Sequence, residues 1–258
     1  MDLGLKGRKA IVCASSRGLG RGCAVALADE GVELVINGRN PETTNATADE
    51  LRSRGVKVTV VLGDVSDPAI QAELLAACPN PDILVNNNAG PALRDFRELD
   101  REAILAGVTQ NMVTPIEMIQ KVIDGMTDRG FGRIVNITSM SVYQPILGLD
   151  LSSGARAGLT SFLAGIARSV IDRNVTINNI LPGKFDTDRI RATFKFGAEK
   201  AGTSIDAERD RQSKLIPAQR LGDPDEFGRT CAFLCSTHAG YLTGQNIKLD
   251  GGLFPSAF

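Results

Sequence analysis

The chain has 258 residues, of which 43% are hydrophobic and 23% are charged, and its formal net charge at pH 7 is −1. This composition is ordinary for one large globular domain, and the charge balance argues against nucleic acid or an anionic membrane as a partner. No apolar run is long enough to span a bilayer, and the N-terminal segment lacks the apolar core of a signal peptide. We therefore expect a cytoplasmic protein.

The cysteines do not form a metal-binding pattern. Five are present without any CxxC pair, and the chain has one histidine, His238, which we interpret as a loop or interface residue. Cys231 and Cys235 stand one helical turn apart, but a zinc site is not expected without further ligands. We expect reduced, buried thiols.

Apolar segments alternate with helix-forming segments along the whole chain. Short apolar runs predict buried strands at residues 10–13, 33–37, 57–62, 82–86, 132–138, 175–181 and 246–249. Good helix formers predict helices over residues 23–28, 41–54, 68–77, 101–126, 152–172 and 223–235, with a break or bend in the fourth near Pro115. Such βα units predict an α/β fold with a doubly wound parallel sheet in a single domain, residues 1–258.

The turn after the first strand predicts an anion site. Residues 14–20, ASSRGLG, join that strand to the start of a helix. The first N–H groups of a helix have no partner within it, and the helix dipole favours negative charge there. Gly18 and Gly20 would let a pyrophosphate approach the backbone. An ordinary strand-to-helix turn is the simpler alternative.

The residues after the second and third strands extend this site. Sheets that bind NAD usually place a carboxylate after the second strand, whereas this chain has Gly38 and Arg39 there. Arg39 and Arg17 would suit a 2′-phosphate, so we favour NADP(H) over NAD(H), with a solvated Arg39 as the alternative. We expect Asp64 to meet the adenine amino group and Val65 to pack on the ring.

These motifs, in their order and spacing, resemble the short-chain dehydrogenase/reductase family over nearly the whole chain. The matching segments are ASSRGLG, GDV, DILVNNNAG, Asn111 in the long fourth helix, GRIVNITS, LPGKFDTD and YLTGQNIKLDGG. The resemblance implies a Rossmann-type fold of about seven strands, a nicotinamide cofactor and commonly a homotetramer, with a dimer as the smaller alternative. The chain is most similar to the 3-oxoacyl-[acyl-carrier-protein] reductase-like branch.

The resemblance also assigns residues to the site. Asn111 and Ser139 match the family's catalytic Asn and Ser. Besides Arg39, the implied cofactor contacts are Ala14, Ser15, Ser16, Arg17, Gly18, Leu19 and Gly20 at the phosphates, Asp64 and Val65 at the adenine, Asn88, Ala89 and Gly90 at the ribose, Arg156 at the nicotinamide ribose, and Pro182, Gly183 and Thr187 beside the nicotinamide.

Three departures from the family pattern stand out. Ala14 replaces the first glycine of the turn, and DILVNNNAG carries one additional Asn, which leaves the register of that loop open by one residue. The family places a Tyr thirteen residues beyond Ser139 and a Lys four residues later, but Ser152 and Arg156 stand there. The Lys lowers the pKa of the Tyr hydroxyl. A Ser hydroxyl is a far weaker acid, and Arg keeps the charge but cannot relay a proton.

Three interpretations of this altered site remain open. In the first, the chain transfers hydride between NADP(H) and a carbonyl/alcohol pair, and Tyr143 donates the proton; a packed loop residue is the alternative role for Tyr143. In the second, Ser139 and Arg156 polarise the carbonyl and a water delivers the proton. In the third, the chain binds NADP(H) as a sensor or structural ligand. The retained cofactor-side residues favour an active oxidoreductase.

The segment 186–217, after the sixth strand, is expected to cover the substrate as a lid. Its basic residues, among them Arg189, Arg191, Lys195 and Lys200, allow an anionic substrate or an acyl carrier protein, with a solvated helix face as the alternative. The substrate is otherwise expected to be a small ketone or a 3-oxoacyl thioester.

Two further sets of apolar residues have an expected place. Phe194 and Phe196 line an apolar pocket or pack within the lid. Leu253, Phe254 and Phe258 make the C-terminus unusually apolar, and we expect this tail to pack between subunits.

Overall fold

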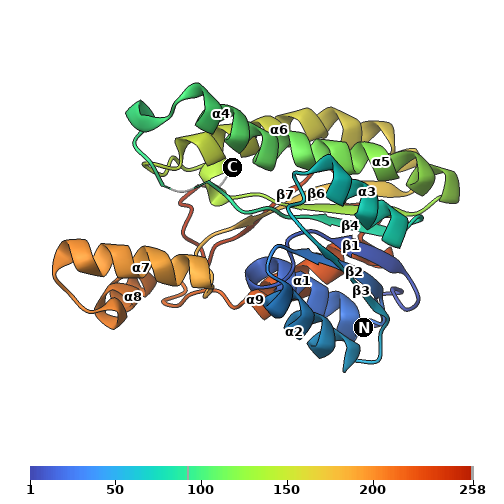
Figure 1. Cartoon of the computed structure of the whole chain (residues 1–258), viewed down its shortest axis with the longest axis horizontal. Coiled ribbons are helices and arrows are strands. Elements are labelled where there is room, and N and C mark those ends of the chain that lie inside the picture. The colour runs from blue at the N-terminus through green and yellow to red at the C-terminus, as the bar shows by residue number, and fades with distance from the viewer. Residues whose placement is uncertain (92, 257–258) are drawn as a thin grey trace.

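The computed structural model describes residues 1–91 and 93–256, apart from the side chains of Phe196 and Lys200. Within these residues, a seven-stranded parallel sheet has the order β3-β2-β1-β4-β5-β6-β7 (Figure 1). The strands are β1 Lys9–Val12, β2 Glu33–Gly38, β3 Val58–Leu62, β4 Ile83–Asn86, β5 Gly132–Ile137, β6 Val175–Pro182 and β7 Asn246–Leu249. The strand order reverses between β1 and β4, and ligands of doubly wound sheets bind at such a switch point. The predicted fold class is confirmed.

Helices cover both faces of the sheet (Figure 1). The helices on one face are α1 Gly18–Asp29, α2 Pro41–Arg52 and α9 Pro224–Cys235. The helices on the other face are α3 Pro68–Ala77, α4 Arg101–Val108, α5 Thr114–Arg129 and α6 Asp150–Ser169. Side chains of β1 alternate between the two cores, with Ala10 and Val12 in the first and Ile11 in the second.

A close contact between α1 and α9 holds the first helix in place. A Cβ atom at Gly228 of α9 would lie 2.0 Å from the carbonyl oxygen of Gly22 in α1. Glycine at both positions therefore lets the two backbones touch. This contact holds α1 in place, so that its N-terminus lies near the carboxyl end of β1, one short turn further along the chain.

The helices differ from the prediction mainly at their ends. The break predicted near Pro115 in the helix over residues 101–126 is confirmed: a π turn at Thr109–Val113 interrupts the helix, and Pro115 lies in the first turn of α5. The helix predicted over residues 23–28 is longer, since α1 begins at Gly18 and ends at Asp29. The helix predicted over residues 152–172 begins at Asp150 and ends at Ser169, and a 3₁₀ turn at Ile171–Arg173 follows it. Apolar periodicity locates a helix but not the residue at which it changes hydrogen-bond pattern.

The predicted lid segment forms a pair of helices, α7 Asp188–Ala201 and α8 Ile205–Lys214, which stand apart from the sheet (Figure 1). Phe194, Ile216 and Leu221 form their small buried core, with Ile190 packed against it. Phe194 is therefore an internal packing residue, whereas the side chain of Phe196 lies outside the described residues. The function of this pair as a lid stays a prediction.

The remaining expectations concern thiols, membranes and the C-terminus. All five cysteines are buried and none forms a disulfide. In the described part of the chain, no helix has the length and apolar character needed to cross a membrane. Leu253 and Phe254 are half-buried within the single chain, and Phe258 lies outside the described residues. Packing of this tail between subunits stays a prediction.

Candidate active site

The N-terminus of α1 is open to an anion. The side chains of Asn40 and Asp67 cap α2 and α3, but no side chain caps α1. Its N-cap residue is Arg17, whose side chain is mostly exposed and lies 3.8 Å from a carboxylate oxygen of Asp188. Free backbone N–H groups, the helix dipole and a nearby cation together suit a phosphate group.

The turn at residues 14–20, called the phosphate turn below, is held in shape by side chains that pack against it. Ser15 Oγ donates to a backbone carbonyl of β1 (2.7 Å) and accepts from the backbone N–H of Asn37 (3.2 Å). The backbone of Ala14 has a φ of +44°, in the left-handed region that favours glycine. A Cβ at Gly20 would lie 2.5 Å from the carbonyl oxygen of Ala14 and 2.7 Å from Nδ2 of Asn87. The turn therefore requires glycine at position 20, and it tolerates Ala14 at the cost of strain.

A cation stands at the end of β2, where an NAD-preferring sheet has a carboxylate. Arg39 Nη1 lies 3.7 Å from Oδ2 of Asp64, and the Arg39 side chain is 64% exposed. Asp64 Oδ1 accepts from the backbone N–H of Ser66 (2.9 Å), and Val65 is buried beside it. Arg39 is therefore held near the predicted adenine position with its guanidinium open to a 2′-phosphate.

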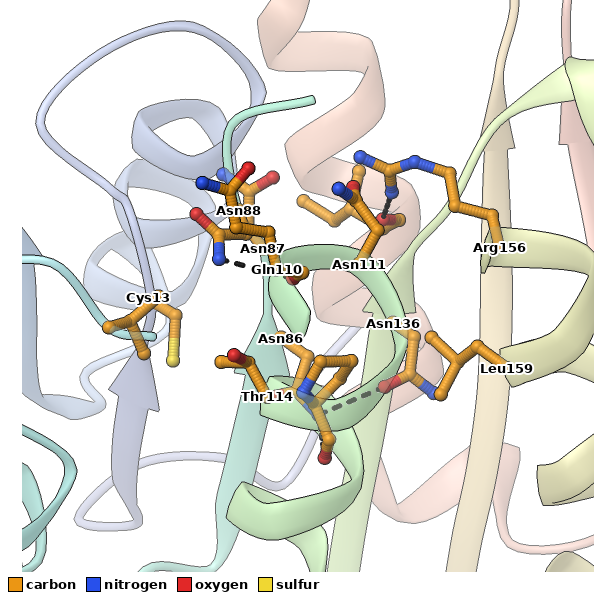
Figure 2. A pocket seen from close by; sticks show the side chains of 13 residues that line it. Cys13, Asn86, Asn87, Asn88, Gln110, Asn111, Thr114, Asn136, Arg156 and Leu159 are labelled. Atoms are coloured by element: carbon orange, nitrogen blue, oxygen red, sulfur yellow. Dashed lines mark hydrogen bonds between the residues drawn. The ribbon is translucent and has the colours of Figure 1, made fainter. Parts of the chain in front are cut away.

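A cavity opens between the carboxyl ends of β4 and β5 and helix α6 (Figure 2). It has about 20 Å³ of space open to water, enough for roughly one water molecule. Side-chain amides are the most frequent polar groups in its lining. The lining residues are Cys13, Val65, Asn86, Asn87, Asn88, Gln110, Asn111, Thr114, Pro115, Asn136, Ile137, Arg156 and Leu159.

Asn111 presents an unsatisfied acceptor to this cavity. It lies in the π turn, and its Nδ2 donates to the carbonyl oxygen of Gly107 (3.2 Å). Its Oδ1 is buried and has no partner within the described residues. A buried amide oxygen is costly to leave unpaired, so this atom is suited to accept from a water or a ligand.

Arg156 approaches the cavity from α6, and Figure 2 shows it converging on Asn111 from the opposite side. Its Nη1 donates to the carbonyl oxygen of Ile137 (2.6 Å) and its Nε to Ser152 Oγ (3.2 Å). Its Nη2 has no hydrogen-bond partner, and the guanidinium has no carboxylate partner, among the residues described. Burial, and then repulsion from Arg189, lower the pKa of Arg156 to about 10. The side chain therefore remains a cation at neutral pH.

The lining contains no group that titrates near neutral pH. Ser152, which is predicted to stand at the family's Tyr position, lies next to the lining: it is 5% exposed, and its Oγ accepts from Nε of Arg156. Burial raises the pKa of the Cys13 thiol to about 12, so this side chain stays neutral. Any proton transferred in the cavity must therefore come from a molecule that enters it, such as water.

A ladder of side-chain amides crosses the sheet next to the cavity. Nδ2 of Asn86 donates to Asn136 (3.0 Å), Nδ2 of Asn136 to Asn179 (3.1 Å), and Nδ2 of Asn179 to Asn246 (2.8 Å). These residues are register partners on β4, β5, β6 and β7. Nδ2 of Asn246 finally donates to the hydroxyl oxygen of Tyr143 (2.8 Å).

This ladder determines where Tyr143 lies. Its ring packs against Phe254, with centroids 5.8 Å apart, and its hydroxyl is held over β7. Because β7 is two strands away from β5, the hydroxyl is separated from the cavity wall at Asn136 by roughly 10 Å. Tyr143 is not among the cavity-lining residues. Its assignment as proton donor stays a prediction that the geometry does not favour.

The structure distributes the other predicted site residues along one edge of the sheet. Ser139 follows β5 directly, is half-buried, and its Oγ accepts from the backbone N–H of Ser141 (3.1 Å). Thr187 adjoins the phosphate turn, since a Cβ at Gly18 would lie 3.6 Å from its methyl group. The remaining predicted residues lie beside these: Ser16 and Leu19 in the turn, and Pro182 and Gly183 at the end of β6.

The three consecutive asparagines at the end of β4 have separate contacts, and the register of that loop relative to the family pattern stays a prediction. Asn86 belongs to the ladder, and Nδ2 of Asn87 donates to the carbonyl oxygen of Ala14 (3.0 Å). Nδ2 of Asn88 donates to Ser66 Oγ (2.9 Å) and to the carbonyl oxygen of Gln110 (3.1 Å). Ala89 and Gly90 continue the loop toward α7.

Sequence reasoning indicated the amide residues that follow the fourth strand but missed two other lining residues, Gln110 and Asn136. Nothing local in the sequence indicated these two, because their position depends on strand register and on the π turn.

Three comparisons place the chain among known proteins. Residues 13–254 match a family model described as enoyl-(acyl carrier protein) reductase. The chain is 31% identical over 255 residues to the NADPH-dependent reductase BacG of Bacillus subtilis (strain 168), which covers 96% of this chain and 98% of the relative. It is 30% identical over 265 residues to the 3-oxoacyl-[acyl-carrier-protein] reductase FabG of Aquifex aeolicus (strain VF5), with 98% and 100% covered.

A solved structure shares the whole architecture. L-Sorbose reductase from Gluconobacter frateurii, complexed with NADPH and L-sorbose, superposes with a TM-score of 0.93 at 27% identity. The match covers 99% of this chain and 100% of the other.

Proposed function

Because the chain belongs to the short-chain dehydrogenase/reductase family, we propose that it is an oxidoreductase that uses NADPH to reduce the carbonyl group of a small molecule. Relatives named as NADPH-dependent reductases, or solved with NADPH, support this cofactor. The uncapped N-terminus of α1 and the cation at the end of β2 fit it independently. A 3-oxoacyl thioester or another small ketone is the proposed substrate.

Different residues on this edge of the sheet would bind different parts of the cofactor. Backbone N–H groups of the turn at residues 14–20, with Arg17, would hold the pyrophosphate, and Arg39 the 2′-phosphate. Asp64 and Val65 would hold the adenine. The loop at residues 88–90, with Arg156, would hold the nicotinamide ribose, and the residues after β6 up to Thr187 would flank the nicotinamide. When bound there, the cofactor supplies the hydride.

The observation that carries the proposal is the cavity in which Asn111 Oδ1 and Arg156 Nη2 both lack a protein partner within the described residues. We propose that one water occupies this space, donates to Asn111 and accepts from Arg156. Ser139 would hydrogen-bond the carbonyl oxygen of the substrate. With NADPH bound, the cofactor would supply the hydride for the carbonyl carbon. The water would pass a proton from bulk solvent to the carbonyl oxygen, so that the carbonyl, the hydride and one proton together make the alcohol.

Three substitutions separate water from Tyr143 as the source of the proton. Tyr143→Phe is expected to keep turnover within about 2-fold, since its hydroxyl contacts Asn246 and not the cavity. Asn111→Leu and Ser139→Ala are expected to lower turnover by about 10²- to 10³-fold. NADPH binding, followed by fluorescence, is the control for each variant. A large loss in Tyr143→Phe alone would assign the proton to Tyr143.

A second candidate function is NADP(H) binding without catalysis, as in a sensor. Ser152 favours it, because a buried alkyl hydroxyl replaces the family's acid. The protein is tested with NADPH and NADH by fluorescence and then with a panel of ketones, sugars and 3-oxoacyl thioesters. NADPH binding with no turnover in the panel would support the sensor, and binding of neither nucleotide would overturn both functions.

We further propose a homotetramer in the cytoplasm. Tyr241 is fully exposed and Phe233 and Phe162 are 39% and 47% exposed in the single chain, which leaves apolar surface for subunit contacts. Light scattering of the purified protein tests the tetramer, and a monomer would contradict it.

A further inference from the structure

One arginine of the α7–α8 segment differs from its neighbours. Arg191 pairs with Asp186 and Asp188, Arg209 with Asp186, and Arg211 with Glu208. Arg189 has no carboxylate partner among the residues that the structure describes.

Neutral acceptors hold Arg189 at the rim of the cavity. Its Nη1 donates to the carbonyl oxygen of Gly90 (3.3 Å) and its Nη2 to that of Pro91 (3.1 Å). The guanidinium lies close against the Gly90 backbone, since a Cβ there would be 2.7 Å from Nη1. Both carbonyls follow Asn88, which lines the cavity. Arg189 thus connects the start of α7 to the loop that borders the cavity.

These bonds are long and join the cation to uncharged oxygens. Charge-assisted bonds between a guanidinium and a carboxylate are shorter and about twice as strong, and they are often bidentate. A carboxylate that reaches this rim would therefore displace the two carbonyls. Nη1 and Nη2 each donate to an oxygen of their own, and the planar guanidinium can donate through the same two nitrogens to the two oxygens of a carboxylate.

A second cation without a carboxylate partner in the described chain lines the cavity that Asn88 borders. Arg156 is 8% exposed in the cavity, and the charge of Arg189 is one cause of its lowered pKa, after burial. Two like charges close enough to repel each other are stabilised by an anion that lies near both. No carboxylate of the described chain takes that place.

We propose that the substrate carries a carboxylate, which Arg189 binds at the rim while Arg156 attracts it from within. This inference rests on the proposed reductase function and names its substrate class. The cofactor's pyrophosphate shares the same anion chemistry, but the open N-terminus of α1 and Arg17 already provide for it. The experiment therefore has one arm for each anion.

The first arm measures binding of NADPH alone, by fluorescence, to the wild type, Arg189→Gln, Arg189→Lys and Arg191→Gln. We expect the four affinities to agree within about 2-fold. Arg191→Gln is the control, because it removes a guanidinium two residues further along α7 that is already paired with Asp186. An affinity for NADPH that falls about 10-fold in Arg189→Gln would assign the residue to the pyrophosphate and overturn the proposal.

The second arm adds malonate, or its uncharged analogue malonamide, to the NADPH-saturated proteins. Malonate is expected to bind the wild type, and Arg189→Gln to weaken it by about 10- to 100-fold, with Arg189→Lys intermediate and Arg191→Gln unchanged. Malonamide is expected to bind none of them measurably. Equal binding of malonate to the wild type and Arg189→Gln would overturn the proposal.

Turnover separates this inference from the reductase function. A series of small oxo acids is compared with the corresponding methyl esters, and the acids are expected to have kcat/KM values at least 10-fold higher, a difference that Arg189→Gln removes. Equal reduction of acids and esters would overturn the carboxylate proposal and leave the reductase function standing. Arg189-dependent malonate binding without reduction of any compound would overturn the reductase function alone.

Discussion

The two halves of the sheet hold their ligands by different means. Around β1 and β2, the phosphate turn offers backbone N–H groups and is shaped by a glycine whose Cβ would clash. Around β5 and α6, the cavity offers side chains, Asn111 and Arg156, held by contacts that other residues could make. A backbone site allows few substitutions, whereas a side-chain site can change its chemistry without changing the fold. This difference fits the prediction that Ser152 replaces the family's acid while the cofactor turn is nearly intact.

The largest effect on NADPH affinity is expected where the backbone site is tightest, at Gly20. In Gly20→Ala the new Cβ meets the carbonyl oxygen of Ala14 at 2.5 Å, so the turn must move. Overpacking of this kind costs about 1–3 kcal/mol, and we expect NADPH affinity to fall by about 10- to 100-fold. Gly165→Ala in α6 is the matched control, because its Cβ meets nothing within 4 Å. An unchanged affinity of Gly20→Ala for NADPH would contradict the claim that the backbone site tolerates fewer substitutions than the side-chain site.

A smaller effect on NADPH affinity is expected at Arg39. This side chain is the one predicted to distinguish NADPH from NADH. Arg39→Gln is expected to weaken NADPH binding by about 10-fold and to leave NADH binding unchanged, because only NADPH carries the 2′-phosphate. Arg52→Gln, which removes an exposed arginine of α2 that is paired with Asp49, is the control. Titration of both nucleotides by fluorescence measures the ratio. Equal losses for the two nucleotides would contradict the assignment.

Acid is expected to affect the α7–α8 pair before it affects the turn at residues 14–20. Hydrogen bonds from Arg211 and Gln212 lower the pKa of Glu208 in α8 to about 2, from an ordinary value of 4.5. The folded chain thus binds this proton less tightly than the unfolded chain. The carboxylate therefore stabilises the fold fully above about pH 4.5, and its contribution is lost as the pH falls toward 2. The contacts between Ser15 and Asn37 in the turn do not titrate.

Hydrogen exchange of α8 and α1 amides, corrected for intrinsic rates, tests this order. The wild type is expected to lose protection in α8 first as the pH falls below about 4.5. Glu208→Gln is expected to be less protected there at neutral pH and to depend less on pH, whereas Glu73→Gln in α3 behaves as the wild type. Simultaneous loss of protection in α1 and α8 would contradict the expected order.

The sequence predicts the backbone half better than the side-chain half, for physical reasons. Strand runs and the small-residue turn are local features, so the sheet, α1 and the position of Arg39 could be inferred directly. The ladder from Asn86 to Asn246 depends on the register of four strands far apart in the chain. That register holds Tyr143 over β7, which its short distance in sequence from Ser139 could not indicate. Proximity along the chain predicts a backbone turn but not the direction of a side chain.

The smallest expected effect concerns Ala14, the one place where the backbone half departs from its family. Its φ of +44° costs an L-residue about 1–2 kcal/mol, whereas glycine adopts this conformation freely but loses about 0.5–1 kcal/mol more entropy on folding. Ala14→Gly is therefore expected to stabilise the fold by about 0.5–1 kcal/mol and to raise the thermal midpoint by about 1–4 °C. Ala103→Gly, in the helical backbone of α4, is expected to destabilise by about 1 kcal/mol. Calorimetry with NADPH absent and present measures both, and a lower midpoint in Ala14→Gly would show that the Ala14 side chain contributes more to the turn than its strain costs.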